Sequence, residues 1–186
     1  MFSLVAKAAS LLLRAVVSGR YTLPIALAPI LLAFGVAFNV RLQSFNRRWL
    51  EWSPFHVKAN VALVPLKWRW VWLPYGLLLA FCMPFLALLE EWLFRYGTTN
   101  WVRGLLWGSI AFGAFHLFSL VSVRMAIYLM LVGAIFVELY MLDGIVAVFV
   151  LHAVYNLSAL ALTIATRNRR ISWLSPRPAA SPAASG

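Results

Sequence analysis

The sequence is dominated by apolar runs that are long enough to cross a lipid bilayer. A helical span needs about 20 mostly apolar residues, and such runs follow one another along most of the chain. We expect spans at residues 22–40, 71–94, 103–119, 124–142 and 144–165. They predict an all-α fold, a polytopic transmembrane helical bundle of about five to six spans with an N-terminal amphipathic helix.

Composition supports this fold class. Of the 186 residues, 63% are hydrophobic and 11% are charged, whereas a soluble domain is about half apolar and a quarter charged. Lipid must therefore solvate much of the surface. Cys82 is the only cysteine, which excludes an intrachain disulfide and a cysteine zinc cluster.

The charge balance is strongly basic, with 16 Lys and Arg against 5 Asp and Glu. The basic residues lie mainly between the apolar runs, where anionic lipid headgroups are found. We therefore expect a bilayer with anionic headgroups as a partner. Nucleic acid is not expected, because the chain has no basic domain outside the membrane segments.

The first residues form a distinct segment. Between residues 2 and 18 the polar side chains recur every three or four positions, as Ser3, Lys7, Ser10, Arg14 and Ser18. This spacing puts them on one stripe of a helix. We expect an amphipathic helix in the membrane interface. A cleaved signal peptide and a sixth span remain alternatives.

Four segments organise the chain. The amphipathic helix covers residues 1–20, and the first span with a basic, aromatic loop covers 21–70. A membrane core follows at 71–166, and a basic tail rich in Pro, Ala and Ser, expected to be disordered, covers 167–186. The positive-inside rule places the 41–70 loop and the tail in the cytoplasm.

Three acids fall within apolar runs, where a charge costs at least about 2.5–3.5 kcal/mol. Glu91 and Arg95 are four residues apart and share a helical face, so they are expected to pair. Glu90 points about 100° away from Glu91 and has no such cation, which suits a general base. An ion-pair staple between helices is the alternative for both acids. Glu138 is expected to be structural.

Two further motifs carry polar side chains in apolar runs. His116 closes Phe112-x-x-x-His116, and taken alone such a histidine is more often a contact between helices than a catalyst. His152 and Asn156 are four apart and project from one helical face. Together they could bind water or steady an oxyanion, or they could form a polar contact between helices.

The motifs Glu90-Glu91-x-x-x-Arg95, Phe112-x-x-x-His116 and His152-x-x-x-Asn156 occur in this order on successive apolar runs. In this they resemble the CPBP family of intramembrane proteases, which includes CAAX prenyl endopeptidases and bacteriocin-processing, Abi-like relatives. The resemblance covers roughly residues 75–165. It implies endopeptidase cleavage of membrane-associated protein or peptide substrates.

The resemblance also implies roles for single residues. Glu90 would activate water with help from His116, while His152 and Asn156 would stabilise the oxyanion. Glu91, Arg95 and Phe112 would support the site. The chain departs from the family pattern at Tyr96, which separates Arg95 from Gly97.

The metal requirement is open at this point. Glu90, His116 and His152 supply one carboxylate and two imidazoles, a set that zinc or another divalent metal accepts in catalytic sites. No H-E-x-x-H motif is present. A metal-free glutamate–histidine mechanism accounts for Asn156 and for the unpaired Glu90 as well, and we favour it over the metal.

Two other functions compete with proteolysis. In a small proton- or ion-coupled transporter, Glu90, Glu91 and Glu138 would line a continuous water path. A non-catalytic immunity or scaffold protein would keep the site as a relic. Straight helices also place Glu90 and His116 at depths about 15 Å apart. The protease reading therefore requires a break in the helices, for which Gly97–Asn100 is the candidate.

Overall fold

The computed structural model describes residues 2–44, 47–52, 69–119 and 122–166. The predicted tail at 167–186 and most of the basic loop lie outside the described residues. Every regular element within them is helical, which confirms the all-α prediction. The elements are α1 (Phe2–Val17), α2 (Thr22–Gln43), the 3₁₀ helix η1 (Arg48–Glu51), α3 (Arg69–Phe94), α4 (Trp101–Arg103), the π-helix η3 (Gly104–Ala111), α5 (Phe112–Phe115), the 3₁₀ helix η4 (His116–Ser119) and α6 (Val123–Thr166).

Three stretches of these helices are long and apolar enough to cross a membrane, at residues 22–42 in α2, 76–94 in α3 and 123–162 in α6. The chain is therefore a multi-pass integral membrane protein. Two of the predicted spans, 22–40 and 71–94, coincide with α2 and α3. The other predicted spans lie in α6 and in the broken segment before it.

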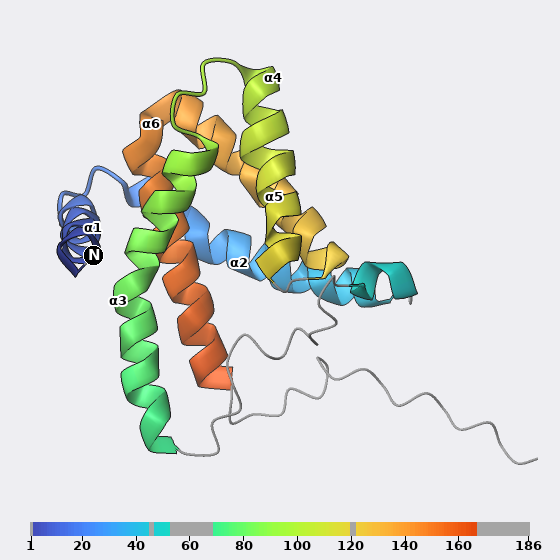
Figure 1. The fold of residues 1–186 in the computed structure, drawn as a ribbon, viewed down its shortest axis with the longest axis horizontal. Helices are drawn as coiled ribbons and strands as arrows, with labels where there is room; N and C mark the ends of the chain where they lie inside the picture. Colours follow the sequence, from blue (N-terminus) through green and yellow to red (C-terminus); the bar gives the residue numbers. More distant parts are fainter. Residues whose placement is uncertain (1, 45–46, 53–68, 120–121, 167–186) are drawn as a thin grey trace, which may run out of the picture.

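Helix α6 consists of two arms. Gly144 has φ 78° and ψ −174°, a left-handed backbone conformation that glycine adopts at little cost. It lies at the boundary predicted between 142 and 144. Figure 1 shows the first arm, residues 123–143, rising to this break, and the second arm, 145–166, returning beside α3. One chain segment thus supplies two walls of the bundle.

The predicted span at 103–119 is not a single regular helix. It contains η3, α5 and η4 in succession. Within η3, Gly104 and Gly108 lie against Val137 on the first arm of α6. A Cβ at either glycine would come within 2.6 and 2.7 Å, respectively, of a Val137 methyl group. These small residues let the two segments pack closely.

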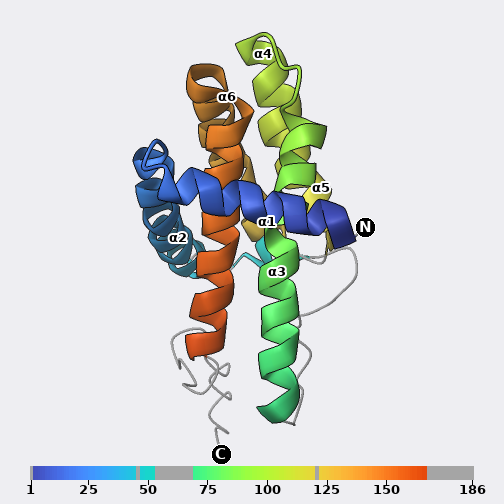
Figure 2. The same ribbon diagram turned by 90° about the vertical axis from the view of Figure 1, so that its left-hand side faces the viewer.

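Helix α1 crosses over α3 and the second arm of α6 (Figure 2). The side chains that it buries are Val5, Ala8, Leu12 and Ala15. The predicted polar stripe, Ser3, Lys7, Ser10, Arg14 and Ser18, is exposed. The amphipathic helix is therefore present, and its place in the membrane interface stays a prediction.

Candidate active site

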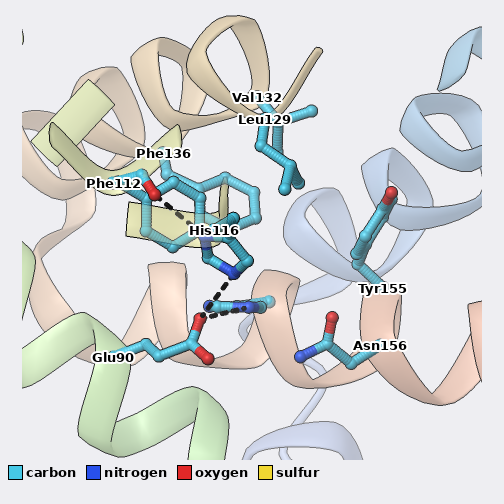
Figure 3. Close-up of a pocket in the computed structure, with 9 residues that line it drawn as sticks. Glu90, Phe112, His116, Leu129, Val132, Phe136, Tyr155 and Asn156 are labelled. Carbon is cyan, nitrogen blue, oxygen red and sulfur yellow. Dashed lines mark hydrogen bonds and ion pairs between the residues drawn. The ribbon is translucent and has the colours of Figure 1, made fainter. Parts of the chain in front are cut away.

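A small cavity lies where α3, α5 and both arms of α6 meet. Its volume is about 70 Å³, enough to hold water. The four sequence-predicted residues that would act on a substrate, Glu90, His116, His152 and Asn156, all line it. Phe112, Leu129, Val132, Phe136 and Tyr155 complete the wall. Figure 3 shows Glu90 and Asn156 at one end of this group, and Leu129 and Val132 at the other.

Glu91 and Arg95 form a buried ion pair behind the cavity. Both side chains are 0% exposed, and Arg95 Nη1 donates to Glu91 Oε1 over 2.7 Å. Arg95 Nη2 donates to the carbonyl oxygen of Gly108, also over 2.7 Å. The pairing expected from the i, i+4 spacing is therefore confirmed. A buried pair of this kind needs additional hydrogen bonds to offset desolvation, and η3 supplies one.

Two aromatic rings enclose the Arg95 guanidinium. Its central carbon lies 4.5 Å from the ring centroid of Phe112 and 5.0 Å from that of Phe136, within cation–π range. The Phe136 ring also lies 5.1 Å from the His152 ring. Sequence reasoning missed Phe136. Its spacing from Leu129 and Val132 puts all three on one helical face, but nothing local shows that this face meets Arg95.

His152 connects the ion pair to the cavity. Its Nδ1 lies 2.6 Å from Glu91 Oε1, the oxygen that also accepts from Arg95. A carboxylate held by a guanidinium only accepts hydrogen bonds, so we assign the hydrogen to Nδ1 of His152. This leaves Nε2 to face Glu90, whose Oε2 is 3.5 Å away.

His116 is oriented in the same way by a backbone carbonyl. Its Nδ1 lies 2.8 Å from the oxygen of Phe112, which can only accept, so Nδ1 again carries the hydrogen. Nε2 of His116 lies 3.8 Å from Glu90 Oε2. Both imidazoles thus turn Nε2 toward the same carboxylate oxygen.

Glu90 Oε2 is the focus of this arrangement. It is buried and has no hydrogen-bond partner among the described residues. Its separations from the two Nε2 atoms exceed ordinary hydrogen-bond lengths. When both histidines are neutral, three acceptor atoms face one another, which calls for a donor between them. A water molecule in the cavity would donate hydrogen bonds to these acceptor atoms.

The depth difference expected for straight helices, about 15 Å between Glu90 and His116, is wrong. The turn after α3 carries Gly97 with φ 75°, and Asn100 caps α4 by accepting from the amide of Arg103 over 2.8 Å. Figure 1 shows this connection rising beyond the end of α3 before the chain descends. The descending segment also includes a π-helix, so its residues do not follow an α-helical register.

The departure at Tyr96 does not prevent the turn. The amides of both Arg95 and Tyr96 donate to the carbonyl oxygen of Glu91, and Gly97 supplies the positive φ one residue later. The amide of Gly97 then donates to the Tyr140 hydroxyl over 3.1 Å. Tyr140 thereby ties the turn to the first arm of α6.

The cavity is also connected to α2, which the sequence did not predict. The Tyr155 hydroxyl donates to that of Tyr128 over 3.2 Å, and Tyr128 donates to the carbonyl oxygen of Leu31 over 2.7 Å. Gly35 makes room for this contact, since a Cβ there would lie 2.6 Å from the Tyr128 hydroxyl. Glu138, by contrast, does not line the cavity.

The predicted metal ligands do not form a metal centre. Zinc needs its ligand atoms at about 2.0–2.2 Å around one point. Glu90, His116 and His152 are suitable donor types. Yet within the part of the chain that the structure describes, no three His, Cys, Asp or Glu side chains are placed to hold a metal ion together.

Comparison with known proteins assigns a segment of the chain to a family. A family model described as type II CAAX prenyl endopeptidase Rce1-like matches residues 67–158, about half of the chain. The matched segment contains all the residues that line the cavity. No curated protein and no solved structure matches the chain significantly.

Proposed function

Residues 67–158 are a domain of the Rce1-like type II CAAX prenyl endopeptidase family, which implies an intramembrane protease, and we propose that this chain hydrolyses peptide bonds of membrane-associated proteins or peptides with a water activated by Glu90. The observation that carries the proposal is the buried Oε2 of Glu90. It faces Nε2 of His116 and of His152 across a cavity of water size.

In the first step, Glu90 takes a proton from the water as the water attacks the substrate carbonyl carbon. Neutral His116 accepts a hydrogen bond at Nε2 from the other O–H group of the water. This bond orients a lone pair of the water oxygen toward the carbonyl carbon. This role matches the imidazole orientation fixed by the Phe112 carbonyl. A positioned general base of this kind contributes typically 10²–10⁴-fold to the rate.

The attack converts the carbonyl oxygen into an oxyanion, which needs hydrogen-bond donors. His152, when protonated, offers Nε2–H to the cavity, and the Glu91 carboxylate at 2.6 Å from Nδ1 stabilises that imidazolium. Asn156 adds its amide from the same face of α6, one turn further on. The ion pair with Arg95 holds the Glu91 carboxylate in place for this task.

The tetrahedral intermediate then collapses. The bond between carbon and nitrogen breaks, and the proton held by Glu90 passes to the departing amine. The products are a new carboxyl terminus and a new amino terminus, and Glu90 is again a carboxylate. Atoms and charges balance without a further reactant.

We also propose a topology. The chain crosses the membrane at α2, at α3, at the broken segment 101–119 and at each arm of α6, which gives five crossings. The 41–70 loop and the C-terminal tail then lie together on the cytoplasmic side, in agreement with the distribution of basic residues.

The experiment that tests the function is identification of protein ends in the membrane fraction. Wild type and Glu90→Gln are compared at equal protein level, with capture of both new N-termini and new C-termini. Ends that depend on Glu90 are expected and would name substrates. If membranes that contain the substrate yield the same protein ends with wild type and with Glu90→Gln, proteolysis is excluded.

Glu138→Gln is the matched control, because it makes the same substitution at an acid in α6 that does not line the cavity. The protease account expects cleavage to continue in this variant. A transporter would instead depend on Glu138 as well as on Glu90, and a scaffold protein would tolerate both changes.

A further inference from the structure

Helix α1 packs against the junction between α3 and the second arm of α6. Leu12 and Ala15 pack there in a cluster with Ala87 of α3 and with three residues of α6, Phe149, Val150 and Ala153. The residues contributed by α3 and α6 are all 0% exposed. Helix α1 and residues up to 66 lie outside the family-matched segment.

The covered residues adjoin the site. Ala87 lies one helical turn before Glu91, and Ala153 directly follows His152. One helical turn further along α3, the same junction is bridged by the hydrogen bond from His152 Nδ1 to Glu91 Oε1, at 2.6 Å. Figure 2 shows α1 lying across both helices. The same pair of helices is therefore contacted by α1 and joined by a polar bond at neighbouring positions.

We propose that α1 is a positioning element that sets the separation of α3 and α6 at the Glu91–His152 bond. Small side chains at Ala15, Ala87 and Ala153 bring the three helices close together, so a change in α1 is transmitted directly to their spacing. The expected effect of α1 on kcat rests on the proposed function. The expected effect of α1 on the Glu91–His152 hydrogen bond does not depend on that function.

The helix offers a matched pair of variants. Leu12 is 8% exposed and packs in the cluster, whereas its neighbour Leu13 is 65% exposed. Leu12→Ala and Leu13→Ala remove the same atoms from the same helix. Only the first removes packing from the cluster that adjoins the site.

The measurement is nuclear magnetic resonance of the full chain in lipid nanodiscs with ¹⁵N-labelled histidine. The Nδ1 proton of His152 in a short bond to a carboxylate resonates far downfield, and its loss in His152→Gln assigns it. Leu12→Ala is expected to shift this resonance, and Leu13→Ala to leave it unchanged. On substrates identified in the membrane fraction, kcat of Leu12→Ala should fall on the order of tenfold or more, with KM nearly unchanged.

Two further variants keep the test decisive. Leu12→Met nearly conserves the side-chain volume and is expected to retain the wild-type resonance and kcat. Leu12→Val is a milder truncation, which is measured if Leu12→Ala fails to fold. Equal responses of the Leu12 and Leu13 variants, or a folded Leu12→Ala or Leu12→Val protein with an unchanged resonance, would overturn the proposal. A shifted resonance in a protein whose wild type cleaves nothing would leave the positioning role standing and remove the proteolytic function.

Discussion

His152 of α6 and Glu91 of α3, which are 61 residues apart in the sequence, are joined by a hydrogen bond of 2.6 Å. The same carboxylate oxygen is paired with Arg95, so one acid anchors a cation on one side and orients an imidazole on the other. The adjacent Glu90 faces the cavity. The two neighbouring acids thus have separate places, one behind the site and one within it.

Removing Arg95 should destabilise the protein strongly. Arg95→Met leaves Glu91 as an uncompensated buried charge, and loss of one partner from such a pair costs about 3–5 kcal/mol. Arg95→Lys keeps the charge but cannot bond Glu91 and Gly108 through two nitrogens of one planar fork, so we expect a smaller loss. Thermal unfolding in detergent measures both.

Arg103→Met serves as the control for the Arg95 variants, since Arg103 is exposed. Its unfolding temperature should match that of the wild type. Equal stability of Arg95→Met and the wild type would show that the Arg95–Glu91 pair does not hold the site together.

Asn156→Ala should reduce kcat and leave KM nearly unchanged. An oxyanion donor acts mainly in the transition state, and loss of one costs about 10²–10³ in kcat. Asn39→Ala is the matched control, because the Asn39 amide bonds to the Gly35 carbonyl within α2 and does not line the cavity. A raised KM with unchanged kcat for Asn156→Ala would instead assign Asn156 to substrate binding.

Chelators should leave cleavage unchanged. The site residues are not arranged to hold a metal ion among the described parts of the chain, and the proposed mechanism uses side chains and water. The purified protein is dialysed against 1,10-phenanthroline and assayed, followed by addition of zinc. Loss of cleavage on dialysis and its return with zinc would contradict the metal-free mechanism.

The proposed topology predicts which positions can be labelled from the cytoplasmic side. In a Cys82→Ser background, a cysteine at Lys58 in the 41–70 loop should react with an impermeant maleimide only in inside-out vesicles. A cysteine at Asp143, the last residue of the first arm of α6, should react only in right-side-out vesicles. The reverse pattern would invert the orientation, and labelling of both from one side would change the number of crossings.

The sequence predicted the features that depend on local spacing. The Glu91–Arg95 pair and the common face of His152 and Asn156 follow from helical periodicity. The boundary at Gly144 follows from the place where two apolar runs meet. These relationships join residues within a few positions of one another. A helix fixes such geometry whatever packs around it.

Relationships between helices could not be predicted in this way. Nothing local indicates that Glu91 accepts from His152, that Phe136 stacks on Arg95, or that Tyr155 reaches α2 through Tyr128. The false difference in depth between Glu90 and His116 has the same origin. It assumed straight α-helices, whereas a raised turn and a π-helix lie between them.

The central claim, that Glu90 activates a water molecule for direct hydrolysis, is tested by isotope transfer. A peptide is made that spans a cleavage site identified in the membrane fraction. It is incubated in H₂¹⁸O with wild type, Glu90→Gln or Glu138→Gln, and the masses of the products are measured by mass spectrometry. The account predicts ¹⁸O in the new carboxyl terminus with wild type and Glu138→Gln, and at least a hundredfold slower product formation with Glu90→Gln. Cleavage at the wild-type rate by Glu90→Gln would contradict it.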